Sequence, residues 1–142
     1  MRALLDVNVL IALLDADHLH HARARDWLLA HAAKGWASCP ITENGCVRIM
    51  SQATYPNTLP TAAVIERLAE ATRSPAHRFW PDAVSLLDPC IVDGRRVLGP
   101  RQVTDLYLVA LAVKNRGRLA TFDSGIPLGV VAGATHRHLA VI

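Results

Sequence analysis

The fold of this chain is decided near its start by residues 3–14, which read ALLDVNVLIALL. Residues 3–5 are a short apolar run that ends at Asp6, and such a run predicts a strand buried on both faces. Asn8 is placed to cap the helical segment 9–14 that follows it. A strand without a polar face that leads directly into a helix is typical of a parallel sheet covered by helices.

Strands and helices alternate along the rest of the chain. We expect strands at 36–39, 77–80, 118–122 and 139–142, and helices at 19–33, 40–50, 61–72 and 102–116. Residues 54–60 and 88–101 are expected to be loops because of their prolines and glycines, and 83–87 a short strand or a turn. Helix 102–116 is apolar all round over residues 106–113, so it belongs in the interior. These elements predict an α/β fold, a three-layer α/β/α sandwich with a central, mainly parallel sheet, in a single domain over 1–142.

The composition excludes disordered, fibrous and membrane-spanning proteins. Of the 142 residues 51% are hydrophobic and 19% charged, which suits a folded domain with a sizeable core. The longest uninterrupted apolar run, residues 106–113, is too short to cross a bilayer, and the apolar start lacks the cleavage site of a signal peptide. Three widely spaced cysteines (Cys39, Cys46 and Cys90) without a CxxC pair suit a reducing compartment. We therefore expect a soluble, cytoplasmic domain.

Four acidic residues lie where the predicted elements should bring them to one edge of the sheet. Asp6 and Asp123 follow predicted strands, Glu43 lies on the core-facing side of helix 40–50, and Asp105 begins the apolar helix. Ligands of parallel sheets bind outside the carboxyl ends of the strands. An isolated charge on such elements is costly to bury, so the four acids are expected to converge on a shared cation. Oxygen ligands without Cys or His favour a hard ion, Mg²⁺ or Mn²⁺.

Each acid also has a purely structural explanation. Asp6 and Asp105 are good candidates for helix N-caps, and Glu43 is favoured near the start of a helix by the helix dipole. Residues 123–125, Asp-Ser-Gly, are typical of a turn. We prefer the shared site because all four acids would otherwise reach the same edge by coincidence.

Four ordered stretches resemble those of PIN-domain ribonucleases, and among these the VapC toxins of VapBC toxin–antitoxin pairs. The stretches are LLDVNVLI (4–11), TE (42–43), VTDLYLVALA (103–112) and LATFD (119–123). Their order and approximate spacing are those of the family, and together they cover essentially the whole chain. The resemblance implies a single PIN domain over 1–142.

The resemblance also implies a metal-dependent endoribonuclease, a hydrolase of RNA phosphodiester bonds. Its Mg²⁺ or Mn²⁺ ligands would be Asp6, Glu43, Asp105 and Asp123, with Asn8, Thr121 and Ser124 in supporting positions. Water would attack phosphorus in line and leave 5′-phosphate and 3′-hydroxyl ends. The implied partners are RNA, a second copy in a homodimer, and a small VapB-type antitoxin that covers the acidic site. One departure is Gly125, where many relatives carry a further Asp; it bears on whether one ion binds or two.

The charge balance agrees with an RNA substrate. The formal net charge is +3 and the pI about 9.1, and thirteen of the fifteen cations are Arg. Fifteen cations against the eight acids that remain outside the site leave +7 on the rest of the molecule. Such a surround attracts a phosphate backbone. The candidates for RNA contact are Arg73, Arg78, Arg95, Arg96 and Arg101. Trp36, Trp80 and Tyr55 are candidates to stack a base, with core packing as the alternative for both Trp residues.

The sequence leaves open the role of one histidine cluster and two alternative functions. His18, His20 and His21 form an H-x-H-H cluster that could bind zinc or RNA phosphate, or could pack against a helix. An aspartyl-phosphate phosphatase or receiver domain is disfavoured, because Asn8 replaces the second acid of D-x-D and both lysines belong to helices. A PIN nuclease that processes RNA without an antitoxin is one alternative function. A noncatalytic module that binds RNA or protein is the other.

Overall fold

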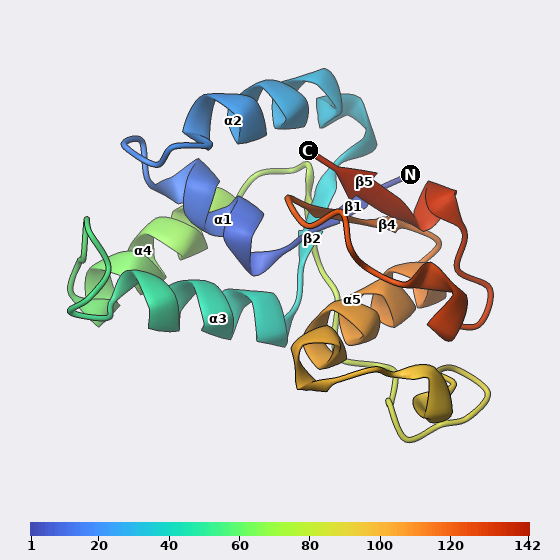
Figure 1. Ribbon diagram of the computed structural model, residues 1–142. Helices are drawn as coiled ribbons and strands as arrows, with labels where there is room; N and C mark the ends of the chain where they lie inside the picture. Colours follow the sequence, from blue (N-terminus) through green and yellow to red (C-terminus); the bar gives the residue numbers. More distant parts are fainter.

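A parallel sheet forms the centre of the molecule (Figure 1). The computed structural model describes residues 1–142. The five strands have the order β3-β2-β1-β4-β5, and every neighbouring pair is parallel. Leu4 on the central strand is paired with Ala37 on one side and Leu119 on the other. The expected parallel sheet is confirmed. The strand bounds are β1 (Ala3–Leu5), β2 (Trp36–Ser38), β3 (His77–Phe79), β4 (Arg118–Thr121) and β5 (Leu139–Val141).

Helices cover both faces of this sheet, as Figure 1 shows. The α-helices are α1 (Val7–Leu14), α2 (His21–Ala30), α3 (Pro40–Met50), α4 (Thr61–Thr72) and α5 (Val103–Lys114). Short 3₁₀ turns lie at Ala32–Lys34, Gly94–Arg96, Pro100–Gln102, Leu128–Val130 and His136–His138. Helices α1 to α4 pack on one face, and α5 packs on the other together with the long loop that precedes it.

Two hydrophobic clusters, one on each face of the sheet, hold the layers together. Leu5 of β1 belongs to the cluster formed with α1 to α4, whereas the neighbouring Leu4 belongs to the cluster formed with α5. Successive side chains of a strand point to opposite faces, so β1 is buried on both sides. In α5, every residue from Leu106 to Ala112 is buried. The three-layer α/β/α sandwich predicted from the sequence is confirmed.

Several boundaries differ from the expectation. Helix α1 begins at Val7 and is capped by Asp6, so Asn8 lies inside the helix and the cap predicted for it is wrong. Asp105 is not an N-cap either, because α5 begins at Val103 with Gln102 in the cap position. Helix α2 covers only His21–Ala30 of the predicted 19–33 and is followed by a 3₁₀ turn. Residues 83–87 form no strand and contain a turn.

A buried carboxylate ties the loop after α3 to the end of α1. Asp15 is 6% exposed and accepts hydrogen bonds from the Tyr55 hydroxyl and from Asn57 Nδ2, at 3.1 Å for the latter. Burial alone would raise the pKa of Asp15, but these hydrogen bonds outweigh it and hold that pKa below its ordinary value. The loop 54–60 is therefore an ordered part of the fold.

One close approach brings α3 against α1 beside the carboxyl edge of the sheet. A Cβ atom at Gly45 would lie 2.7 Å from Val7 Cγ2, which is closer than real Cβ atoms come. Glycine therefore allows α3 to pack directly beside the residues that follow β1. No helix of the molecule has the length and apolarity needed to span a bilayer.

Candidate active site

Asp6 stands between β1 and α1, at the carboxyl end of the central strand. Its side chain is only 7% exposed. Oδ1 accepts a hydrogen bond from the backbone N–H of Val7 at 2.7 Å, which caps α1. The capping role and the predicted site role are compatible, because one N–H uses only part of the acceptor capacity of a carboxylate.

The Thr121 hydroxyl at the end of β4 orients this carboxylate. Thr121 is fully buried, and its Oγ1 donates to Asp6 Oδ2 at 2.6 Å. The same oxygen accepts from Asn8 Nδ2 at 3.2 Å and from the backbone N–H of Asp123 at 3.1 Å. Since a hydroxyl has a single proton, these two donors fix its direction toward Asp6. The opposite end of the Asn8 amide, Oδ1, is buried and has no hydrogen-bond partner.

Asp105 and Asp123 complete an electrostatically coupled group with Asp6. Burial, and to a lesser extent the charges of Asp6 and Asp123, together raise the pKa of Asp105 to about 6. Burial also raises the pKa of Asp6 against the hydrogen bonds from Thr121 and Val7, and the charge of Asp123 adds to the rise. Three carboxylates from three different elements therefore repel one another at one edge of the sheet.

Asp123 occupies the turn that the sequence suggested. Its Oδ1 accepts from the Gly125 N–H at 2.7 Å, and Ser124 between them is exposed. The side chain of Asp123 is exposed as well, whereas that of Asp105 is half-buried. Neither carboxylate is enclosed by the core as Asp6 is.

Glu43 is held apart from the three aspartates by its own hydrogen bond. It lies in the first turn of α3, and Oε1 accepts from the buried Ser38 hydroxyl at 2.5 Å. Ser38 Oγ also lies 2.8 Å from His77 Nε2. Because the hydroxyl proton is used toward Glu43, His77 Nε2 donates to Ser38. A chain of hydrogen bonds thus runs from β3 through β2 to the carboxylate on α3, and burial lowers the pKa of His77 at its far end.

A cavity of about 590 Å³ opens in front of these residues. Asp6, Asn8 and Asp105 line it, and so do Asn44, Arg48 and Thr104. A neighbouring cavity of about 700 Å³ between α3 and α4 is lined by Glu43 and shares Asn44 and Arg48 with the first. Arg48 was not among the arginines expected from the sequence to bind RNA. The available signal was its position four residues after Asn44, which places both side chains on one face of α3.

The donor set fits a hard divalent cation. The three aspartates offer carboxylate oxygens only, neither of the two ion pairs of the molecule involves them, and Asn8 Oδ1 is an unused acceptor beside them. No three His, Cys, Asp or Glu side chains lie close enough together to hold an ion as they stand. A bound ion would therefore require the carboxylates of Asp105 and Asp123 to lie closer to Asp6 than they do here. All-oxygen sites of this kind prefer Mg²⁺ or Mn²⁺.

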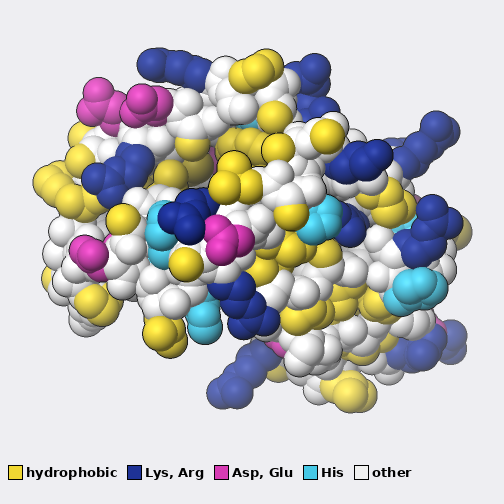
Figure 2. All heavy atoms as spheres, turned by 90° about the horizontal axis from the view of Figure 1, so that it is seen from above, with side chains coloured by type: hydrophobic (Ala, Val, Ile, Leu, Met, Phe, Trp, Pro, Cys, Tyr) yellow, Lys and Arg dark blue, Asp and Glu magenta, His cyan; other side chains and the backbone are white.

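Basic side chains are frequent on the surface of the molecule (Figure 2). Figure 2 shows Lys and Arg side chains spread across the face seen from above, with few Asp and Glu side chains among them. All five arginines expected to bind RNA are exposed: Arg73, Arg78, Arg95, Arg96 and Arg101. Three of them have partners: Arg95 lies 3.6 Å from Asp93, Arg96 donates to the Gly129 carbonyl at 2.6 Å, and Arg78 donates to the His77 carbonyl at 2.9 Å.

The three aromatic residues considered for base stacking have contacts within the fold. Trp36 and Trp80 are each 7% exposed and belong to the two core clusters, and the Tyr55 hydroxyl donates to Asp15. Core packing, the alternative for the two Trp residues, is confirmed. None of the three presents a free ring face for a nucleotide base.

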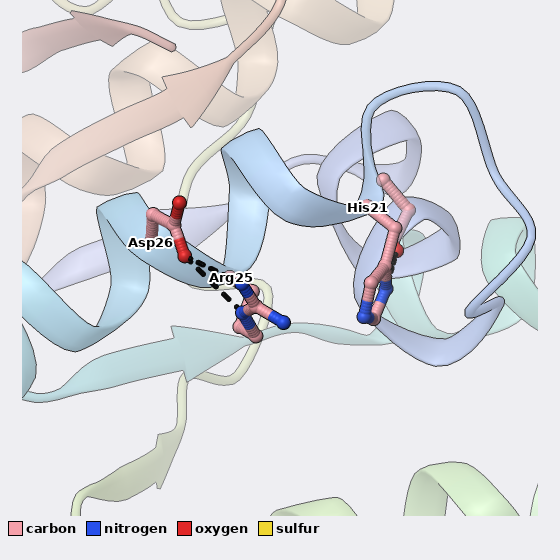
Figure 3. A network of polar contacts seen from close by, with 4 residues as sticks. His21, Arg25 and Asp26 are labelled. Carbon is pink, nitrogen blue, oxygen red and sulfur yellow. Dashed lines mark hydrogen bonds and ion pairs between the residues drawn. The ribbon is translucent and has the colours of Figure 1, made fainter.

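The histidine cluster does not form a metal site. His18 Nδ1 accepts from the backbone N–H of His20 at 3.0 Å, and His21 Nδ1 donates to the Ala12 carbonyl at 2.8 Å (Figure 3). The ring of His20 instead packs against Phe122, with 4.8 Å between centroids. Packing against neighbouring elements accounts for the cluster better than zinc binding does.

Comparison with known proteins identifies the family to which this fold belongs. The sequence matches the family described as PIN domain over residues 3–128. It is 54% identical over 142 residues to Ribonuclease VapC44 of Mycobacterium tuberculosis, covering all of both chains. It is 46% identical over 134 residues to Ribonuclease VapC39 of the same organism, covering 94% of this chain and 96% of the relative.

A solved structure confirms the fold. The crystal structure of Mycobacterium tuberculosis VapC20, described as a sarcin-ricin loop cleaving toxin, superposes with a TM-score of 0.62. The alignment covers 87% of this chain and 91% of that one at 14% identity. The parallel sheet with acids at its carboxyl edge is thus that of a PIN domain. The full-length identity to VapC44 goes further: the chain belongs to the VapC endoribonuclease toxins of the PIN-domain family.

Proposed function

We propose that this VapC-type endoribonuclease is metal-dependent and that Asp6, Asp105 and Asp123 hold its Mg²⁺ or Mn²⁺, with Glu43 as a fourth acid. The observation that carries the proposal is the gathering of three aspartates at one edge of the sheet, where burial, and with it the mutual repulsion of their charges, raises the pKa of Asp105 to about 6. A fold retains such repulsion most readily where a cation offsets it. When bound, the ion would activate water and neutralise charge on the phosphodiester.

The residues around the carboxylates have distinct parts in this proposal. Thr121 keeps the Asp6 carboxylate in one orientation through the 2.6 Å hydrogen bond from its hydroxyl. Asn8 Oδ1, buried without a partner, is available to accept a hydrogen bond from a water in the cavity. Arg48, exposed at the shared rim of the two cavities, is placed to bind a backbone phosphate.

Glu43 and Ser124 have secondary parts in the proposed metal site. The Ser38 hydrogen bond holds the Glu43 carboxylate on the far side of Asn44 and Arg48, in the second cavity. Glu43 would join the aspartates by exchanging that hydrogen bond for the ion. Ser124 is proposed only as a neighbour of Asp123 in its turn.

In this proposal the substrate is RNA, and exposed arginines hold its phosphate backbone. Arg73, Arg78, Arg95, Arg96 and Arg101 remain our candidates because each is exposed. Their role is electrostatic and not specific to sequence, so each would contribute to the salt dependence of binding.

The remaining proposals rest on membership of the VapC group. We propose that residues 1–142 act as one PIN domain, that the protein forms a homodimer, and that a VapB-type antitoxin binds it. A cytoplasmic location suits its three free cysteines, of which Cys39 and Cys46 are buried and Cys90 exposed. Co-expression with its VapB-type antitoxin, followed by light scattering of the purified complex, tests both assemblies.

The activity is tested by incubating purified protein with total RNA in Mg²⁺, in Mn²⁺ and in EDTA, beside Asp6→Asn. We expect discrete fragments with 5′-phosphate ends that require metal and are absent with the variant. Fragments in EDTA would contradict metal dependence. Intact RNA in every sample, together with RNA binding unaffected by Mn²⁺, would favour the noncatalytic binding module instead.

A further inference from the structure

A small aromatic and cationic surface begins one residue away from the acidic site. Phe122 stands between Thr121 and Asp123, so its Cα lies about 3.8 Å from the Cα of each. The side chain is half-buried: it packs partly against the core cluster formed with α1 to α4 and remains partly open to solvent. The part of the ring that stays open to solvent lies on the segment that joins two residues of the site, Thr121 and Asp123.

Two residues near the start of α2 meet this ring. The half-buried His20 packs against it with 4.8 Å between ring centroids and 40° between ring planes. The guanidinium of the exposed Arg23 lies 5.8 Å from the Phe122 centroid. Aromatic faces and guanidinium planes are the groups that stack unpaired nucleotide bases, whereas a duplex offers only its edges and backbone.

Arg23 has no ion-pair partner, whereas neighbouring polar side chains of α2 are already used within the fold. Arg25 is paired with Asp26 at 3.0 Å, and His21 is used by the Ala12 carbonyl, as Figure 3 shows. Arg23 takes part in neither of the two ion pairs of the molecule. Its charge is therefore free for a phosphate, while that of Arg25 is already partly neutralised.

We propose that His20, Arg23 and Phe122 form a subsite for single-stranded RNA beside the cleavage centre. One base stacks on the surface formed by His20 and Phe122, and Arg23 binds the adjoining backbone phosphate. The subsite orients the strand as it passes Asp123 toward the acidic cavity. This inference rests on the proposed function, because it assigns a contact to the same substrate.

The test separates stacking from phosphate binding with two probes. Fluorescence anisotropy measures binding of labelled oligoadenylate and of an abasic ribose–phosphate oligomer of the same length. All proteins carry Asp6→Asn so that the RNA stays intact. The added variants are Phe122→Leu, which keeps an apolar side chain in the core cluster, and Arg23→Gln, which changes only an exposed residue. Arg25→Gln is the matched control on the same helix.

The two variants are expected to differ in a defined way. Phe122→Leu weakens oligoadenylate binding by about tenfold, the effect of losing one stacked base, and leaves binding of the abasic oligomer unchanged. Arg23→Gln weakens binding of both probes and lowers the salt slope by about 0.7, the value for one phosphate contact on a single strand. Arg25→Gln changes neither.

The inference is overturned if Phe122→Leu affects both probes equally, or if Arg23→Gln behaves like Arg25→Gln. Failure of the Asp6→Asn protein to bind either probe overturns it as well. Cleavage of total RNA by the protein without Asp6→Asn is measured in parallel. If that RNA is cleaved while the variants bind normally, the subsite is wrong and the proposed function stands. If no metal supports cleavage, the proposed function fails, and loss of stacking in Phe122→Leu would still support the subsite.

Discussion

Replacing Asp105 by Asn should stabilise the metal-free protein above pH 6. The folded-state pKa of Asp105, about 6, lies above its ordinary value of 3.8. Its contribution to stability is therefore fully present below about pH 4 and is lost as the pH rises through 6. Asparagine has nearly the same shape as aspartic acid and never ionises, so the variant keeps at high pH the stability that the wild-type protein loses when Asp105 becomes charged.

The size of the effect follows from the pKa difference and the exposure of the side chain. A rise from 3.8 to about 6 would correspond to about 3 kcal/mol if fully realised. Asp105 is only half-buried, and solvent screening reduces this to about 1.5 kcal/mol. Its negative charge in the first turn of α5 is favourable by about 0.5 kcal/mol. We expect a net gain of about 1 kcal/mol, or about 3 °C in Tm.

Thermal and urea unfolding in EDTA between pH 4 and pH 8 measures this gain. Asp17→Asn, which changes an exposed aspartate outside the acidic group, is the control and should show no gain that depends on pH. A variant less stable than wild type at pH 8 would refute the electrostatic account. So would a gain that persists undiminished at pH 4, since the wild-type carboxyl is then protonated.

Three further substitutions test the hydrogen bonds around the site and the fold. Tyr55→Phe removes the hydroxyl that donates to Asp15, so the free energy of urea unfolding at neutral pH should fall by about 1.5 kcal/mol. Because the pKa of Asp15 is lowered in the folded state, this deficit should disappear as the pH falls below about 4. A deficit independent of pH would contradict this explanation. Ser38→Ala removes the hydrogen bonds of Ser38 to Glu43 and His77, so the free energy of unfolding should fall by about 1 to 2 kcal/mol. Because Glu43 is then free to join the aspartates, cleavage by the folded variant should not fall, and a loss of cleavage would contradict the arrangement. Thr121→Val removes the proton donated to the carboxylate that caps α1, and Mn²⁺ affinity measured by calorimetry should fall about tenfold to a hundredfold; wild-type affinity would show that this hydroxyl does not orient a ligand.

The sequence identified the acids that follow strands because a local pattern marks them. A largely apolar run that ends in an aspartate predicts both the strand and the edge at which the carboxylate lies, as with Asp6 after residues 3–5 and Asp123 after residues 118–122. The cap of α1 was assigned wrongly because Asp6 and Asn8 are both favourable cap residues two positions apart. Only the position where β1 ends decides between them, and strand ends are poorly marked in sequence.

The contacts that depend on strand order could not be predicted. Ser38 meets His77 only because β2 and β3 are neighbours, with Trp36 in register with His77. The packing of His20 on Phe122 likewise joins segments that are far apart in the chain. Each requires the sheet order β3-β2-β1-β4-β5, which no local periodicity of the sequence contains.

The central claim of the account is that Asp6, Asp105 and Asp123 together hold a divalent cation. Calorimetric titration of the metal-free protein with Mn²⁺, beside Asp6→Asn and the Asp17→Asn control, tests it most directly. Saturable binding by wild type and Asp17→Asn, and its loss in Asp6→Asn, is the predicted result. Equal binding by all three proteins, or no binding by any, would contradict the claim.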